Sequence, residues 1–481
     1  MFFHILFIII LFVEILICIY NLVKLLIFNK KAKSILGSNN SSSSSSSSTS
    51  NYKINILIPC LREQDIIKNT LNHFSKIIDT NTTNIYIITT DKEIYERNAS
   101  KHLIPSLAND IKSNMPISLL ISKYNKLFPS SILEELLKYN KKSLKDLQII
   151  INDAFDNCPT TFEYISNLDF VKSNNVFHII NYPYKTSSMA EQLNYAIKVI
   201  SNNCVTCPER TYFSIYNADS LPDESTFMEL DRKIVSNNFP QILQQYSIFD
   251  SNFSELSFIM KGFSVYQTSY ELKNGIINNI VSSSFYSPHV VGHGLTIRLD
   301  TLKQFNGFNT NFWCEDIYLT AQINNSNIHI VPLFALESAE SPKYLNIQIK
   351  QNAVWFKTAF QHIHILKDIK RTEKISLYGY LWLASEFRAT FSWLLMPVFI
   401  LYSFIFPLIN LNPLAFISSV LIYLLFAYVN YCLNIKIVQK FIHFKFSNNI
   451  SVFFGTCIAL LLTNLGPIFS FFTNEKHKTA R

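Results

Sequence analysis

Four long apolar segments constrain this chain more than any other feature. The first, residues 2–28, is longer than the roughly 20 apolar residues that a helix needs to cross a bilayer. Three more follow late in the chain, at about 390–410, 414–435 and 450–472. Hydrophobic residues make up 48% of the chain and charged residues only 16%, which is too apolar for an ordinary soluble protein. The sequence therefore predicts an integral membrane protein.

The first apolar segment is interpreted as an uncleaved membrane anchor. It is too long for the apolar region of a signal peptide, no basic region precedes it, and no small-x-small cleavage site follows it. The flanking stretch "NKKAK" (29–33) is basic, and such flanks remain in the cytosol. We therefore expect a multi-pass protein of the plasma membrane, Golgi or ER. Glu14 and Lys24 interrupt the apolar segment.

The formal net charge of +8 is explained by basic loops beside a membrane. No stretch dense in Lys and Arg is interleaved with aromatic residues, as a nucleic-acid-binding surface would require. The sequence thus predicts membrane lipids as partners and no nucleic acid.

Shifts in composition divide the chain into five predicted segments. A serine tract at 38–50 cannot bury a core and is typical of a flexible tether. Aromatic residues mixed with Glu386 and Arg388, at 376–388, suit a helix that lies in the membrane interface. The predicted segments are an anchor at 1–30, a Ser-rich linker at 31–52, a large domain at 53–360 with an insertion at about 98–175, an interfacial segment at 361–389 and a transmembrane region at 390–481.

The large domain alternates between strand-like and helix-like patterns. Continuous apolar runs predict buried strands, and apolar residues at helical spacing predict the helices between them. This alternation is typical of an α/β fold with a mainly parallel sheet, in which ligands bind at the carboxyl ends of the strands. The predicted strands are 53–60, 84–91, 176–183 and 211–219, and the predicted helices are 64–78 and 187–200.

The stretch "YNADSLPDE" (216–224) places Asp219 at the end of a predicted buried strand. A hard divalent cation prefers oxygen ligands and takes several of them from water or substrate phosphates, so one carboxylate at a strand end can anchor it. Asp also caps turns, and Pro222 follows closely. From these residues alone, both interpretations of Asp219 stay open.

An acidic pair, Glu315 and Asp316, opens the predicted helix in "CEDIYLTAQI". Carboxylates at a helix start are favoured by the helix dipole alone. The glycine-rich stretch at 290–308 precedes the pair and allows backbone to approach a ligand closely, so a carboxylate there can also act as a general base. Further on, Gln351 and Trp355 lie four residues apart on one predicted helix face. A tryptophan at such a position either stacks on a sugar ring or packs in the core, and from these residues alone both interpretations stay open.

In this order, the segments resemble the family-2 inverting glycosyltransferases, the membrane-bound group that includes cellulose, chitin and hyaluronan synthases and ceramide glucosyltransferase. The matching stretches are "ILIPCLREQDIIKNTL", "ITTD", "YNADSLPD", "GHGLTIR", "CEDIYLT" and "QNAVW". The resemblance covers about 51–95 and 176–360. It implies a GT-A type fold at 53–360 and makes that segment a glycosyltransferase domain, which would be cytosolic.

The resemblance also implies roles for residues on the donor side. Glu63, Asp91 and Asn217 would contact the nucleotide of a UDP- or GDP-sugar, and Asp219 would bind Mn2+ or Mg2+ on its diphosphate. Asn217 replaces the first acid of the family's DxD element, which gives up a charge but keeps an oxygen acceptor.

On the acceptor side, the resemblance makes Asp316 the general base for an acceptor hydroxyl, with Glu315 beside it. His293, Gln351 and Trp355 would contact the acceptor, which is a polysaccharide or a lipid. Val354 stands where the family has an arginine. The alternative is a catalytically degenerate transferase domain that serves as a membrane scaffold.

Overall fold

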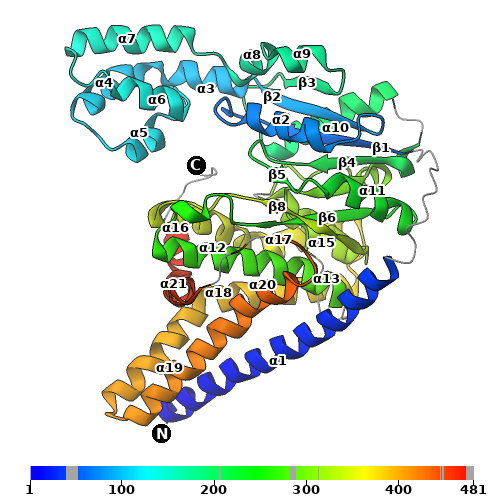
Figure 1. Ribbon diagram of the computed structural model, residues 1–481, viewed down its shortest axis with the longest axis vertical. Helices are drawn as coiled ribbons and strands as arrows, with labels where there is room; N and C mark the ends of the chain where they lie inside the picture. The colour runs from blue at the N-terminus through cyan, green and yellow to red at the C-terminus, as the bar shows by residue number, and fades with distance from the viewer. Residues whose placement is uncertain are drawn as a thin grey trace. The chain divides into compact units, whose positions relative to one another are not determined.

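The computed structural model describes residues 2–39, 52–204, 207–281, 289–312, 314–444, 446 and 449–472. Most of the predicted serine tether lies outside these residues. The chain divides into two compact units. We call Asn51–Leu221 with Leu295–Thr310 the α/β unit, and Met1–Ser50 with Pro222–Gly294 and Asn311–Lys478 the helical unit. Figure 1 labels their helices and strands.

The α/β unit contains five strands in the order β3-β2-β1-β4-β7. All neighbouring pairs are parallel except β4 and β7, which are antiparallel. Ile54, Ile56 and Ile58 of β1 are fully buried, and each such side chain contributes roughly 1.5–3 kcal/mol to folding. The strands are β1 (Lys53–Pro59), β2 (Thr83–Thr90), β3 (Phe177–Tyr182), β4 (Thr211–Ile215) and β7 (Leu295–Arg298), with helices α2 (Ile67–Ile77), α10 (Met189–Cys204) and α14 (Leu299–Gln304).

The chain between β2 and β3 is helical and has an apolar core of its own, which includes Leu107, Tyr124 and Ile151. The guanidinium of Arg97 donates to the carbonyls of Phe155 and Cys158, at 2.5 and 2.6 Å, and joins the first of these helices to the longest one. The helices are α3 (Lys92–Ser100), α4 (Ile104–Lys112), α5 (Ile117–Tyr124), α6 (Ser130–Leu137), α7 (Leu144–Asn157), α8 (Thr161–Ser166) and α9 (Asp169–Ser173).

The helical unit surrounds the parallel strands β6 (Ile242–Ile248) and β8 (Ile330–Ser338). Its shorter helices are α11 (Thr226–Ser236), α12 (Phe258–Glu271), α13 (Asn278–Val281), α15 (Glu315–Asn325), α16 (Leu345–Phe356), α17 (His362–Thr372), α20 (Leu433–Val438) and α22 (Leu465–Ser470). A π-helical segment, η4 (Leu272–Ile277), joins α12 to α13, and a second, η6 (Tyr428–Cys432), precedes α20. The two-residue strand β5 (Leu221–Pro222) stands in the chain where the units divide.

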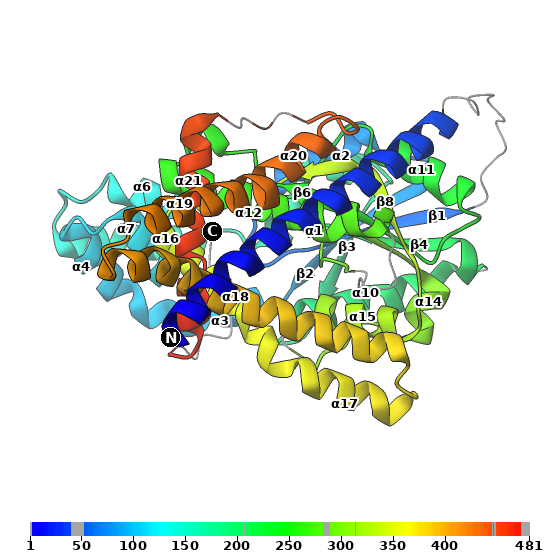
Figure 2. The same cartoon turned by 90° about the horizontal axis from the view of Figure 1, so that it is seen from below.

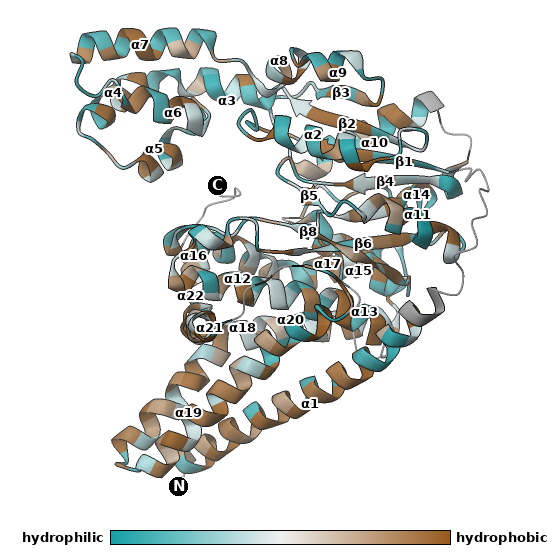
Figure 3. Ribbon diagram, viewed as in Figure 1, coloured by the Kyte–Doolittle hydropathy of each residue, from teal (hydrophilic) through white to brown (hydrophobic). Residues whose placement is uncertain are grey.

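Four helical stretches of the described chain are long and apolar enough to cross a membrane: Phe2–Ile35, Leu377–Ile409, Pro413–Val438 and Ile450–Ser470. They contain α1 (Phe2–Asn39), α18 (Leu377–Ile409), α19 (Pro413–Ala427) and α21 (Ile450–Leu462). Figure 3 shows that α1 and α19 are predominantly hydrophobic, and many of their large apolar side chains are exposed. Such a surface is typical of contact with lipid.

The predicted fold class is confirmed: an α/β fold with a mainly parallel sheet, flanking helices, one apolar helix near the N-terminus and three toward the C-terminus. One detail differs from the expectation. Residues 377–388, which the sequence separates as an interfacial segment, are the first turns of α18 and continue into the next apolar stretch without a break. Ser376 caps this helix by accepting from the Gly379 amide, and the first proline inside it is Pro397.

The apolar helices pack closely on the rest of the helical unit. Leu25 and Phe28 of α1 join a buried cluster with Tyr246 of β6 and Ile276 of η4. Gly262 of α12 faces Gly455 of α21 so closely that a Cβ at Gly262 would lie 2.1 Å from the Gly455 oxygen. Small residues of this kind let helices approach at backbone distance. Figure 2 shows α1 running alongside α20.

Candidate functional site

The predicted site residues fall into two groups. Glu63, Asp91, Asn217 and Asp219 belong to the α/β unit, and His293, Glu315, Asp316, Gln351 and Trp355 belong to the helical unit. We describe each group by itself.

Asp91 directly follows β2, at the carboxyl end of the parallel strands. Its Oδ1 accepts from the side-chain amide of Asn181, at 2.7 Å, and its own amide donates to the Tyr182 carbonyl, at 3.0 Å. Thr89 in turn donates to Asn181 Oδ1, at 3.0 Å. The two partner residues lie on β3, so the neighbouring strand fixes the carboxylate where parallel sheets bind ligands.

Glu63 lies in the loop between β1 and α2, and a buried acid that the sequence interpretation missed organises this loop. Glu93 is 4% exposed. Its Oε1 accepts from the Gln64 side chain, at 2.7 Å, and from the Thr161 amide, at 3.0 Å, while Oε2 accepts from the Arg62 amide, at 3.3 Å. The only feature of the sequence that could have indicated a role for Glu93 was its position, two residues after "ITTD".

Asn217 and Asp219 lie in a turn directly after β4. The Tyr216 amide donates to the Leu57 carbonyl, at 3.0 Å, which extends the pairing of β4 with β1. The turn is closed because the Asn217 amide donates to Ser220 Oγ, at 3.0 Å, and the Ser220 amide to the Asn217 carbonyl, at 3.1 Å. The hydroxyl of Thr70, which lies on α2, donates a hydrogen bond to the Ala218 carbonyl. Asp219 is half-buried at the tip.

The oxygen atoms of this turn fit a divalent cation that takes most of its ligands from water or a bound substrate. Asn217 and Asp219 supply oxygen, which Mg2+ and Mn2+ prefer. The described residues contain no group of three or more His, Cys, Asp or Glu side chains arranged to hold a metal.

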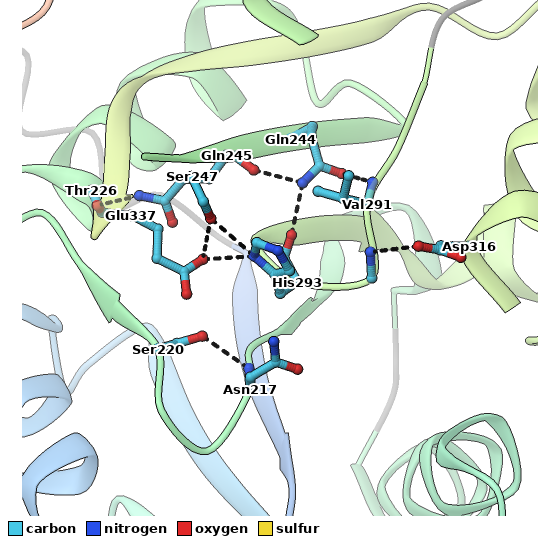
Figure 4. Close-up of polar contacts among 11 residues, drawn as sticks. Asn217, Ser220, Thr226, Gln244, Gln245, Ser247, Val291, His293, Asp316 and Glu337 are labelled. Carbon is cyan, nitrogen blue, oxygen red and sulfur yellow. Dashed lines mark hydrogen bonds and ion pairs between the residues drawn. The ribbon is translucent and has the colours of Figure 1, made fainter. Parts of the chain in front are cut away.

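Asp316 lies in the first turn of α15 and is joined to the glycine-rich loop that precedes β7. Its Oδ2 accepts from the Gly292 amide, at 3.2 Å (Figure 4), and its Oδ1 from the Ile317 amide, at 2.8 Å. A Cβ at Gly292 would lie 3.4 Å from Glu315 Oε1 and 3.6 Å from Asp316 Oδ2. Both predicted acids therefore face this loop, and glycine allows the close approach.

The next residue of the loop, His293, is held by a buried acid. Its Nδ1 lies 2.9 Å from Glu337 Oε2 and 3.3 Å from Ser247 Oγ. Glu337 is 3% exposed and stands near the end of β8. Figure 4 shows the three side chains converging. Sequence reasoning missed Glu337 because nothing in its apolar surroundings marks it as functional.

Buried amides fix the backbone of the same loop. Gln244 of β6 donates through Nε2 to the His293 carbonyl, at 2.8 Å, and accepts through Oε1 from the Val291 amide, at 3.2 Å (Figure 4). The Tyr246 hydroxyl donates to the His289 carbonyl, at 3.0 Å. Gly294 has φ of +63°, a conformation that favours glycine. The loop is therefore preorganised along its described length, from His289 to Gly294.

Electrostatics add a fourth acid to this group, beside Glu315, Asp316 and Glu337. Burial raises the pKa of Glu271, at the end of α12, to about 7. This pKa already includes the effect of His293, which lowers it, and of the negative charges of Asp316 and Glu337, which raise it. Burial also lowers the pKa of His289, and the charge of Asp316 opposes that shift. Perturbed titratable groups that gather around one loop are typical of functional sites.

The structure does not join Gln351 and Trp355 to this loop by any hydrogen bond between described residues. Gln351 Oε1 accepts from Gln267 of α12, at 3.5 Å. The Trp355 side chain is 38% exposed, so it does not pack in the core, whereas Val354 is buried. An exposed indole remains available to a ligand.

Each of the two sets of residues, taken by itself, can supply one part of the chemistry of a transfer reaction. The acids at the strand ends of the α/β unit can hold a polar ligand and a cation, and the Asp316 carboxylate can accept a proton.

No protein-family model and no curated protein matches the chain. Similar solved structures include the mannosyltransferase PcManGT from Pyrobaculum calidifontis in complex with GDP-Man and Mn2+; its TM-score is 0.42 at 10% identity, over 97% of this chain and 100% of that one. Another is S. aureus TarS 1–349 in complex with UDP-GlcNAc, with a TM-score of 0.37 at 14% identity, over 83% of this chain and 95% of that one.

Proposed function

We propose that the protein is a membrane-bound, nucleotide-sugar-dependent glycosyltransferase of the family-2, GT-A type, which transfers a sugar with inversion to a lipid or polysaccharide acceptor. The observation that carries the proposal is the preorganised loop from His289 to Gly294, which Asp316 holds on one side and Glu337 on the other. The motif order in the sequence and the four apolar helices support the same function.

On the donor side, Glu63, Asp91 and Asn217 bind the nucleotide of a UDP- or GDP-sugar. Asp91 is suited to hydroxyl groups because Asn181 fixes its orientation. Asp219 holds Mn2+ or Mg2+, which when bound neutralises charge on the diphosphate. Asn217 offers its side-chain oxygen to the ribose or to a water molecule.

On the acceptor side, Asp316 removes the proton from the attacking hydroxyl. The acceptor oxygen forms a bond to the anomeric carbon while the bond from that carbon to the diphosphate oxygen breaks, and the nucleoside diphosphate leaves with the electron pair. A single displacement of this kind inverts the anomeric configuration. His293, positioned by Glu337, contacts the acceptor together with Gln351 and Trp355.

The test is a donor panel. Membranes that contain the full-length protein are incubated with a set of UDP- and GDP-sugars and Mn2+, and released nucleotide is measured against membranes without the protein. We expect release with one donor and inverted sugar in either a lipid or a polymer fraction. Absence of release with every donor would contradict the proposal and favour the scaffold alternative.

A further inference from the structure

A tyrosine of β6 joins the loop from His289 to Gly294 to the helix α13. Tyr246 is fully buried. Its hydroxyl donates to the His289 carbonyl, at 3.0 Å, and accepts from the side-chain amide of Asn279 on α13, at 2.7 Å. Because a carbonyl can only accept, the hydroxyl uses its one proton on His289, and Asn279 has to be the donor. Two hydrogen bonds therefore run in series from α13 to the start of the described loop.

The sequence of β6 turns two polar side chains toward this loop. Residues two apart on a strand share a face, and Gln244 and Tyr246 both bond the loop. Gln244 holds Val291 and the His293 carbonyl, while Tyr246 holds His289. The pairing of β6 with β8 is irregular between the two residues, and such irregularities re-aim side chains next to active sites.

The ring of Tyr246 is fixed by packing as well as by its hydroxyl. A Cβ at Gly275 would lie 2.3 Å from Tyr246 Cε1, so the ring rests directly on the backbone of η4. This segment is π-helical, a geometry that occurs frequently at functional sites. Burial raises the pKa of Tyr246, so the hydroxyl keeps the proton that it donates. The side chain therefore has one position and one protonation state.

The apolar helix α1 holds both ends of α13. Lys24 of α1 donates to the side-chain oxygen of Asn278, the first residue of α13. Lys31 donates to the carbonyl of Val281, the last residue of α13, at 2.7 Å. Phe28, which lies between the two lysines, belongs to the same buried cluster as the β6 tyrosine. Printed contacts thus connect α1 to α13 and α13 to the loop.

We propose that Tyr246 and Asn279 are positioning residues for the transfer reaction. They fix the loop from His289 to Gly294 on α13, and thereby on α1, the proposed membrane anchor. The Gly292 amide of this loop donates to Asp316, so a loop that is held at its start places the groups around the proposed general base. The role in the reaction rests on the proposed function, whereas the coupling of Tyr246 to the loop does not.

The loss of any buried hydroxyl lowers stability, so the test needs a matched control. Tyr246→Phe removes only the hydroxyl and keeps the ring that packs on Gly275. Tyr423 of α19 is 4% exposed, and its hydroxyl donates to the Cys457 carbonyl. Tyr423→Phe therefore removes the same kind of hydrogen bond, at a place in the helical unit that is not bonded to the loop.

The first measurement is hydrogen–deuterium exchange of the full-length protein in a neutral detergent, read by mass spectrometry on peptides that span 289–294. In Tyr246→Phe we expect about tenfold faster exchange at the Val291 and Gly292 amides, because the loop loses the hydrogen bond at its start. Asn279→Leu should give a smaller increase, since the hydroxyl remains but loses its donor. Tyr423→Phe should exchange like the wild type in this loop, and thermal unfolding verifies that each variant is folded.

The second measurement is steady-state kinetics with a donor found in the panel. We expect kcat about tenfold lower in Tyr246→Phe, with the donor KM unchanged, and wild-type values in Tyr423→Phe. A purely structural role would instead affect both variants alike.

The link to α1 is tested with Lys24→Met, which keeps an unbranched side chain but removes the donor to Asn278. Loop exchange should rise a fewfold, whereas Lys30→Met, at an exposed position of the same helix, should leave it unchanged. Equal exchange in these two variants would overturn the link to α1.

Unchanged loop exchange in Tyr246→Phe, or an equal increase in Tyr423→Phe, would overturn the positioning role. Faster exchange with an unchanged kcat would also overturn it, because the reaction would then not need the hydroxyl. Lack of turnover in the wild type would count against the proposed function alone, because the exchange measurement needs no donor.

Discussion

The two units hold their site acids in different ways. In the α/β unit, Asp91 and Asp219 stand at strand ends and are positioned mainly by the sheet itself. In the helical unit, the loop that contains His293 is fixed by buried side chains of β6 and β8. The comparison teaches that the strand-end acids of the proposed donor side rely mainly on backbone topology, whereas the proposed acceptor side relies on a polar network whose members must all be satisfied.

The largest expected effect concerns the donor side. Asp219→Ala removes the one carboxylate that we assign to the cation, and metal-dependent transfer should be abolished. The measurement is nucleotide release over a range of Mn2+ concentrations. Asp223→Ala changes an acid a few residues away that caps the following turn through Ser225, so it should retain transfer. Equal loss in both variants would assign the effect to the turn rather than to the metal.

A smaller effect is expected for the acceptor network. Glu337→Gln weakens the charged contact with Nδ1 of His293, so kcat should fall about tenfold to a hundredfold while the KM for the donor stays unchanged. Glu337→Asp should recover part of the rate because it keeps the charge. A rise in donor KM with unchanged kcat would place Glu337 on the donor side and break the comparison.

The matching change in the α/β unit should act on binding instead. Glu93→Gln weakens three hydrogen bonds that fix the loop around Glu63, and we expect the donor KM to rise about tenfold or less. Steady-state kinetics at varied donor concentration measure this. A pure fall in kcat would show that the loop does not serve the donor.

A pH effect on stability is expected from Glu271. Because its pKa is raised from 4.5 to about 7, the folded protein keeps a proton that the unfolded chain loses between these values. The free energy of unfolding should therefore fall by about 3 kcal/mol as the pH rises from about 4.5 to 7, and become level above about pH 8. Thermal unfolding of the wild type and of Glu271→Gln, at pH values on either side of this window, measures this change in stability. The variant should lack the part of the pH dependence that Glu271 causes. An identical slope in both proteins would contradict the assignment.

The smallest effect is expected for Asn217→Asp. The turn is closed by the backbone amide and carbonyl of residue 217, so the new carboxylate should not disturb it. Transfer should stay intact, and the Mn2+ concentration needed for half-maximal activity should stay the same or decrease. A collapse of activity would mean that the asparagine amide has a role that an acid cannot replace.

The sequence located the strands β2 and β4 well, although β4 ends at Ile215 rather than at Asp219, and it predicted the buried network poorly. Continuous apolar runs located β2 and β4 and therefore Asp91 and Asp219, because strand periodicity is local. The antiparallel pairing of β7 with β4 was not foreseen. Glu337 and Glu271 were also missed, since their partners lie far away in the sequence and burial of an acid leaves no local pattern.

The most direct test of the account compares Asp316→Asn with wild type, with the donor found in the panel. Asp169→Asn is the control, because Asp169 is an exposed acid in the first turn of another helix, α9. The account predicts a fall in kcat of about a hundredfold to ten-thousandfold for Asp316→Asn, with donor binding retained, and no change for the control. Unchanged turnover in Asp316→Asn would contradict the central claim that this carboxylate accepts the proton of the attacking hydroxyl.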